Sequence, residues 1–480
     1  MLNKIKGKWN KVPIEVKVST AYAVCSILQK CLSFITLPLF TRLLTTEEYG
    51  QYTIYSSWFG ILVIFLTLNL AYGSFQTAMV KYENRRDDYI SSVEGICMLL
   101  SAIFLLIYLP FRNLWNKLFE LPTIFVLLMV SEIFFMTSTQ FWMEKKRFEY
   151  KYKGVVAVTL LTSILSPILA FLCVSVSDEK GYARIVGYAA INIIIGFIIF
   201  GINTRQSRKF CDREFWKYAI GFNVPLLIYY LSQVVFNQSD RIMISHITGT
   251  SDAAMYGVAY NLATVLTFVL NAINGAYVPW IYKKIKDNRE EENKNISIII
   301  IILMALMILI VIWYAPEIIL IMAGKSYKSA IYVVAPVAMS LLLLFYSQLF
   351  INVEFYYEEK GALVYGSIGA AVLNIILNYL FIPVFGYVAA GYTTLVSYMV
   401  FAVSNFYTLR LILKKRNLLD NMYNYKIMML IFVIFMFCGF LGMVLYKLRF
   451  LRIVITLIVF VAVIVKRNEF IKSIKEIREK

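Results

Sequence analysis

Two charged residues stand near the middle of long apolar stretches of this 480-residue chain, where a charge is costly. Lys30 lies near the middle of the apolar stretch 19–39, and Glu132 lies near the middle of the stretch 121–143. A lysine in such a place faces a wet cavity, pairs with an acid, or extends toward the membrane surface. We expect Lys30 to be a cavity cation. Glu132 is expected either to couple transport to an ion by exchanging protons or to form a salt bridge, with Lys30 as one partner.

Other charged residues fall near the ends of apolar stretches, where water or lipid headgroups can solvate them. Arg42 and Arg241 occupy equivalent outer ends of the first and seventh stretches, so interfacial anchoring or helix-end packing is the favoured interpretation. Asp240 beside Arg241 is expected to form an exposed pair. Glu94 and Glu354 are expected to be solvated for the same reason.

The composition explains why those charges are unusual. The chain is 60% hydrophobic and only 16% charged, with a mean hydropathy of +0.70, which excludes a soluble enzyme and makes the bilayer the solvent. A net charge of +18 then reflects cytoplasmic loops, and no nucleic-acid partner is expected. With one histidine and no CxxC pair, no metal site or cofactor is expected.

Helices that cross the membrane must therefore position Lys30 and Glu132. Most of the apolar stretches reach the roughly 20 residues that a spanning helix needs, and we expect fourteen spans, with thirteen as the alternative. The stretches are 19–39, 52–73, 91–110, 121–143, 154–176, 183–203, 218–239, 255–278, 296–316, 330–352, 361–382, 387–409, 427–446 and 450–465.

The loops between these stretches alternate in charge. If the N-terminus lies inside, 35 of the 47 Lys and Arg residues fall on the inner side and 11 on the outer side. This asymmetry predicts a multi-pass protein with both termini in the cytoplasm. All loops are short, so we expect the helix bundle itself to perform the function.

The sequence also resembles itself at an offset near 205 residues. Five pairs of short motifs recur with offsets between 204 and 208 residues, which predicts two units of six spans entering the membrane in the same direction. The pairs include Lys153-Gly154 with Lys360-Gly361, Gly181-Tyr182 with Gly386-Tyr387, and Tyr49-Gly50 with Tyr256-Gly257.

Several of these motifs resemble the polysaccharide (Wzx-type) flippases, which belong to the same superfamily as multidrug and toxin extruders and peptidoglycan-precursor flippases. The resemblance rests on the segment 34–44 followed by Glu48-Tyr49-Gly50, on Pro225 with Gln238-Ser239-Asp240-Arg241, and on Asn374, Asn378, Pro383 and the segment 386–391. It covers most of the chain through about residue 415.

The resemblance implies an all-α integral membrane protein with two parallel, MATE-like lobes of six helices. The repeat places these lobes at residues 1–213 and 214–415, followed by two extra helices and a basic cytoplasmic tail in 416–480. It further implies a bacterial inner-membrane flippase that moves an undecaprenyl-diphosphate-linked oligosaccharide outward for O-antigen or capsule synthesis, beside a polymerase or other export machinery.

Such a cargo needs cations for its phosphates and polar or aromatic groups for its sugars. Lys30 is the first candidate for the phosphates, with Arg42 and Arg241 as an outer phosphate-release site. Candidates for sugar contact are Tyr229, Tyr230, Tyr346 and Asn374, although hydrogen bonding between helices is the favoured role for Asn374. Because no ATP-binding motif is present, an ion gradient, the membrane potential or removal of cargo is expected to drive transport.

Two other functions fit parts of the sequence. Ion-coupled multidrug efflux would use the same fold, and the balance of charges within the spans does not exclude it. A multispan polymerase or glycosyltransferase would need a substantial outer loop with catalytic residues, whereas the outer loops here are short. The sequence therefore favours a transporter over an enzyme.

Overall fold

The computed structural model describes residues 14–358, 361–416, 418 and 422–456, and every regular element in these residues is helical. Its contacts group the chain into two compact units, Met1–Ser245 (unit 1) and His246–Lys480 (unit 2).

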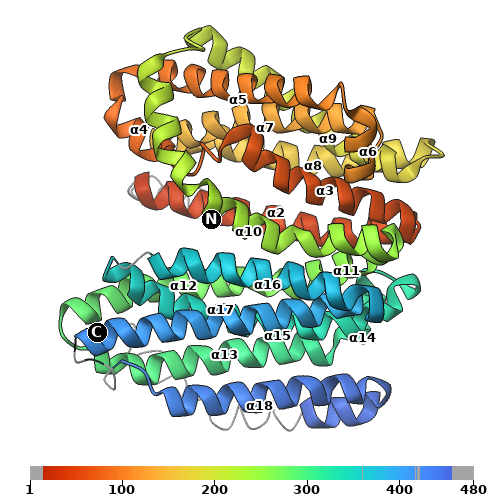
Figure 1. Cartoon of the computed structure of the whole chain (residues 1–480), viewed down its shortest axis with the longest axis vertical. Coiled ribbons are helices and arrows are strands. Elements are labelled where there is room, and N and C mark those ends of the chain that lie inside the picture. Colours follow the sequence, from red (N-terminus) through yellow and green to blue (C-terminus); the bar gives the residue numbers. More distant parts are fainter. Residues whose placement is uncertain (1–13, 359–360, 417, 419–421, 457–480) are drawn as a thin grey trace, which may run out of the picture. The chain divides into compact units, whose positions relative to one another are not determined.

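Unit 1 holds nine of the described helices, the last of which runs on past its boundary (Figure 1): α2 (Ile14–Leu43), α3 (Thr46–Thr67), α4 (Phe75–Lys81), α5 (Arg86–Tyr108), α6 (Arg112–Phe119), α7 (Thr123–Phe148), α8 (Tyr152–Val176), α9 (Lys180–Gln206) and α10 (Arg213–Thr248). Unit 2 holds α11 (Thr250–Ala263), α12 (Thr267–Lys286), α13 (Asn293–Trp313), α14 (Ala315–Met322), α15 (Ile331–Tyr356), α16 (Gly361–Phe385), α17 (Val388–Lys415) and α18 (Tyr425–Val444).

Eleven helices of the described residues are long and apolar enough to cross a membrane, or twelve if the bent helix α10 counts as one span. The expected total of fourteen is therefore not confirmed. Helix α3 covers the second expected span, but polar residues fill its first half. It ends at Thr67 rather than near residue 73, because Leu68 and Asn69 adopt left-handed backbone conformations with φ of 48° and 52°. The last expected span, 450–465, extends beyond Thr456 and so outside the described residues.

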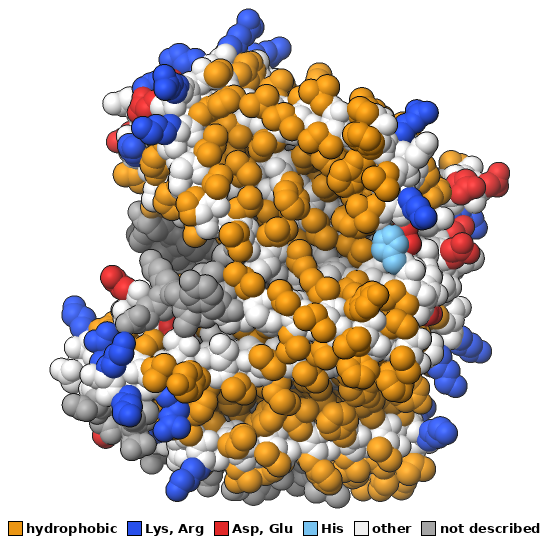
Figure 2. Space-filling model, viewed as in Figure 1, with side chains coloured by type: hydrophobic (Ala, Val, Ile, Leu, Met, Phe, Trp, Pro, Cys, Tyr) orange, Lys and Arg blue, Asp and Glu red, His pale blue; other side chains and the backbone are white. Residues whose placement is uncertain are grey.

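Large hydrophobic side chains cover the flanks of the helices, and Lys and Arg gather near the helix ends (Figure 2). Examples include Leu106 at 72% exposure on α5 and Phe437 at 68% on α18. An apolar surface of this extent would be unfavourable in water but is stable against acyl chains. The chain is therefore a multi-span membrane protein.

The first turns of α10 pack against the other helices of unit 1. Phe215 and Ala219 are fully buried in one apolar cluster with Tyr82 and Tyr89. Arg85 strengthens this attachment by pairing with Asp212 at 2.9 Å, in the segment just before α10. The division at Ser245 reflects contacts within the fold, so it keeps α10 with unit 1. The lobe boundaries at 213 and 415 follow instead from the sequence repeat, and they stay a prediction.

A bidentate ion pair fastens the end of the described chain to unit 2. Arg452, in the helical residues 449–456, donates from Nη1 and Nη2 to the two carboxylate oxygens of Glu317 at 3.0 and 2.8 Å. Arg452 is only 2% exposed. Burial alone would raise the pKa of Glu317, but the hydrogen bonds and charge of Arg452 outweigh it and hold that pKa below its usual value.

Replacing Glu317 with glutamine is expected to lower the melting temperature of the purified protein, because it leaves a buried guanidinium uncompensated at a cost of about 3 kcal/mol. A carboxyl whose pKa is lower in the folded state stabilises the protein above its unfolded pKa and loses this effect as pH falls through its folded pKa. The melting temperature of the wild type should thus fall more steeply in acid than that of Glu317→Gln. Parallel pH profiles would contradict this.

Candidate functional site

Glu132 lies on α7 in the interior of unit 1 and is 6% exposed. The hydroxyl of Tyr55 on α3 donates to its Oε2 at 2.7 Å, and Nδ2 of Asn192 on α9 donates to its Oε1 at 2.7 Å. No described residue forms an ion pair with Glu132. Three helices thus enclose one carboxyl through neutral donors, so the expected alternative of a salt bridge to Lys30 is not what the structure contains.

A second carboxyl, that of Glu94 on α5, is also buried in unit 1. Glu94 is 1% exposed, which shows that its expected solvation is wrong. Its Oε1 accepts from Nδ2 of Asn203 at 2.8 Å and from the hydroxyl of Ser138. Among the described residues its Oε2 has no hydrogen-bond partner. Glu354 in unit 2 is equally buried, at 1% exposure, against the same expectation.

Helix α9 connects the two carboxyl clusters of unit 1. Asn192 and Asn203 are eleven residues apart, which corresponds to about three turns or roughly 16 Å on one face of the helix. The polar side chains therefore follow a line through the interior of unit 1. Buried carboxyls with neutral partners can take up and release a cation or a proton, which is the chemistry that ion coupling needs.

The expected cations of the first span lie outside this interior. Lys30 and Arg42 are both exposed on α2. Cys25 and Phe40 of the same helix are buried, and the helix packs mainly on α8. Both cations are accordingly placed where a ligand could reach them from outside unit 1.

Arg241 is not the exposed rim residue that the sequence suggested. It is 8% exposed on α10, and its neighbour Asp240 is 1% exposed, so the expectation of an exposed pair is wrong. Nη1 of Arg241 donates to Oε1 of Gln238 at 3.0 Å. Near the same end of α10, the hydroxyl of Ser245 donates to Glu120 of unit 1.

The proposed sugar contacts are placed in different surroundings. Tyr346 is buried on α15, and its hydroxyl donates to the carbonyl of Met428 on α18 at 2.9 Å. Asn374 on α16 is fully buried and contacts the hydroxyl of Thr394 on α17 at 3.4 Å, which is the interhelical role favoured by its sequence. Tyr230 is half-buried on α10, whereas the side chain of Tyr229 lies outside what the structure describes.

Sequence reasoning did not predict the burial of Arg184 on α9, which is 5% exposed. Its guanidinium lies over the ring of Tyr52 at 3.8 Å, with Phe40 at 4.4 Å and Tyr49 at 4.5 Å. Its Nε and Nη1 have no hydrogen-bond partner among the described residues. These cation–π contacts join the C-terminal end of α2 to the N-terminal ends of α3 and α9. The signal available in the sequence was an arginine between two Gly-Tyr pairs, at 181–182 and 187–188.

This fold is shared with known transporters. A structure of the lipid II flippase MurJ in an inward closed conformation superposes with a TM-score of 0.65 at 14% identity, over 90% of this chain and 99% of that one. An inward-facing MATE-family multidrug transporter of the MOP superfamily also gives 0.65, at 12% identity over 83% and 98%. The chain therefore has the all-helical fold of these two transporters, as expected.

The family is given by the sequence match. Residues 16–284 match the model of the polysaccharide biosynthesis protein family, and the chain belongs to this family. Protein 1 of the Lsg locus of Haemophilus influenzae is 21% identical over 352 residues, which cover 72% of this chain and 85% of that protein.

Proposed function

We propose that this protein is a flippase that moves an oligosaccharide linked to undecaprenyl diphosphate from the cytoplasmic to the outer leaflet of the bacterial inner membrane. The product would supply surface polysaccharide such as O-antigen or capsule. The observation that carries this proposal is the family match over 16–284 in a chain with the fold of MOP-superfamily transporters. Both termini are proposed to be cytoplasmic because of the loop charges.

We assign two roles to residues of unit 1: contact with the cargo and binding of the coupling ion. Lys30 and Arg42, which are exposed on α2, would contact the diphosphate of the cargo as it crosses. Glu132, held by Tyr55 and Asn192, would bind the coupling ion or proton inside the same unit. Arg241 is 8% exposed and bonds Gln238 on the same helix, so it is less accessible to cargo than Lys30 and Arg42.

Deletion of the gene in its native host is expected to remove surface polysaccharide and to accumulate the lipid-linked repeat unit in the inner leaflet. Mass spectrometry of extracted lipids measures the intermediate, and access of an impermeant lectin in spheroplasts locates it. An accumulated intermediate that is already accessible from outside would place the block after translocation, and would contradict the proposal.

Multidrug efflux is the second candidate, because the buried carboxyls Glu132 and Glu94 lack a cationic partner among the described residues and would suit an organic cation. Expression of the protein in a drug-sensitive host discriminates the two functions. We expect no change in the inhibitory concentrations of cationic dyes. A broad increase that Glu132→Gln removes would favour efflux instead.

A further inference from the structure

A basic pocket lies at the inner end of unit 2, between three helices. Lys294 of α13, Arg410 of α17 and Lys426 of α18 line it, together with Tyr423 and Asn424, and also Phe406 and Tyr425. Its volume is about 410 Å³, and no acidic side chain is among these residues. All three cations belong to the loops that the charge asymmetry places in the cytoplasm.

The positive charge of this pocket is not neutralised by the described protein. None of Lys294, Arg410 and Lys426 forms an ion pair with an acid of the described residues, and Arg410 and Lys426 are exposed. The N-terminus of α18 adds to the field, because its peptide dipoles point their positive end at this side. There Asn424 caps the helix by accepting from the backbone N–H of Ile427 at 3.2 Å.

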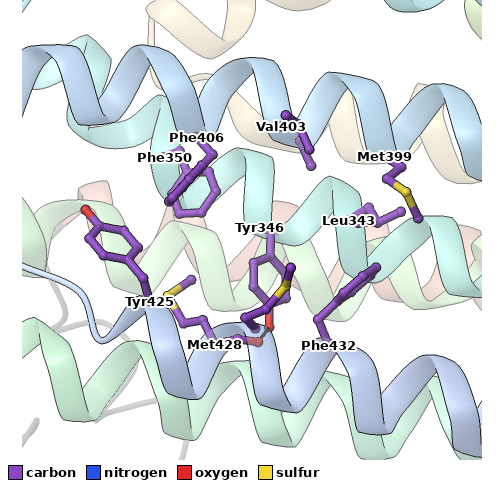
Figure 3. Close-up of a pocket in the computed structure, with 11 residues that line it drawn as sticks. Leu343, Tyr346, Phe350, Met399, Val403, Phe406, Tyr425, Met428 and Phe432 are labelled. Atoms are coloured by element: carbon purple, nitrogen blue, oxygen red, sulfur yellow. Dashed lines mark hydrogen bonds between the residues drawn. The ribbon is translucent and has the colours of Figure 1, made fainter.

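An apolar groove of about 430 Å³ continues from the basic pocket along the side of unit 2. Phe406 and Tyr425 line both cavities and so join them. Figure 3 shows the groove between α17 and α18, with α15 behind it, from Tyr425 at one end to Met399 at the other. Its remaining walls are Leu343, Tyr346, Phe350, Ala402, Val403, Met428, Met429 and Phe432.

We propose that these joined cavities bind an anionic diacyl phospholipid of the inner leaflet, with its phosphate among the three cations and an acyl chain in the groove. Charge complementarity selects an anionic headgroup, since three cations and no acid line the pocket. The contiguous apolar groove selects a lipid over a soluble phosphate, because only a lipid fills both cavities. The bound lipid would hold α18 against α15 and α17, and the site is separate from the proposed cargo cations on α2.

The test uses the full-length protein in detergent, titrated with dioleoyl phosphatidylglycerol or dioleoyl phosphatidylcholine, and measures bound lipid by native mass spectrometry. Near a membrane surface each Lys or Arg contributes about fivefold to binding of an anionic lipid. The variant Lys294→Gln/Arg410→Gln/Lys426→Gln should therefore bind phosphatidylglycerol roughly 100-fold more weakly than wild type. Phosphatidylcholine binding should be weak in both.

Two further variants separate charge from general effects. Lys283→Gln/Lys286→Gln/Lys415→Gln removes the same charge from exposed positions on the inner ends of α12 and α17 that do not line the pocket, and should bind like wild type. Val403→Trp fills the groove from a position that is 60% exposed, and should weaken binding of phosphatidylglycerol without changing charge. If the triple variant fails to fold, binding of phosphatidylglycerol by Lys426→Gln and by Val403→Trp provides the same test.

Four results would overturn the proposal: equal binding of the two phospholipids, retention of phosphatidylglycerol by the triple variant, displacement of the lipid by inorganic phosphate, or binding of undecaprenyl diphosphate in preference to phosphatidylglycerol. The last would assign the pocket to cargo. Because the readout is lipid binding in detergent, failure here leaves the proposed translocation untouched, and a protein inactive in translocation could still bind the phospholipid.

Discussion

Replacing Lys30 with alanine is expected to abolish surface glycan display while the protein stays in the membrane. Lys30 is exposed near the middle of α2, where the charge of a lysine costs about 2.5 to 3.5 kcal/mol on insertion scales. Binding of the anionic cargo would offset this cost. Loss of a charged hydrogen bond of about 1.5 to 3 kcal/mol would weaken the contact with a diphosphate roughly tenfold to 100-fold.

Two matched variants make this result specific. Lys30→Arg keeps the charge and should restore most of the display. Lys17→Ala removes a lysine near the N-terminal start of the same helix and should display glycan normally. Membrane abundance of each variant is measured by immunoblot. Normal display by Lys30→Ala at wild-type abundance would remove Lys30 from the mechanism.

Replacing Glu132 with glutamine is expected to uncouple transport from its driving ion. Glutamine fits the same space and can still bond Tyr55 and Asn192, so the fold should persist, but it cannot take up and release a proton. A gradient of about one pH unit can drive up to about tenfold accumulation for each coupled proton. In proteoliposomes the wild type should respond to an imposed pH or sodium gradient, and Glu132→Gln should not.

The surrounding residues provide the controls. Tyr55→Phe removes one donor to Glu132 but leaves the carboxyl, so the dependence on the gradient should weaken without disappearing. Glu94→Gln tests whether the second buried carboxyl acts on the same path along α9. If Glu132→Gln shows the same pH or sodium dependence as wild type, Glu132 is not the coupling group.

The positions of most helices could be predicted because lipid imposes a simple rule: an apolar stretch of about 20 residues bounded by charge or proline spans the membrane. This rule located Glu132 correctly in the interior of a helix bundle, since a carboxyl at the middle of such a stretch must face protein. It also gave the interhelical contacts of Asn374, because an amide in lipid needs a partner on a neighbouring helix.

The same rule could not predict burial near helix ends. Glu94 and Arg241 lie where solvation is the default, yet both are buried, and Ser138 on α7 and Asn203 on α9 bond the carboxyl of Glu94. The aromatic enclosure of Arg184 depends on three helices meeting, which one sequence does not reveal. The end of α3 at Thr67 likewise depends on local backbone conformation at Leu68 and Asn69, within a stretch that stays apolar.

The central claim, translocation of a lipid-linked oligosaccharide, is tested most directly in proteoliposomes that contain only this protein and a fluorescent undecaprenyl-diphosphate oligosaccharide. A membrane-impermeant reductant reports the fraction of label in the outward leaflet over time. Wild-type protein is expected to make nearly all the label accessible to the reductant. In protein-free vesicles and in vesicles with Lys30→Ala, the half of the label that lies in the inner leaflet should stay protected. Protection that is unchanged by folded wild-type protein, under any imposed ion gradient, would contradict the account.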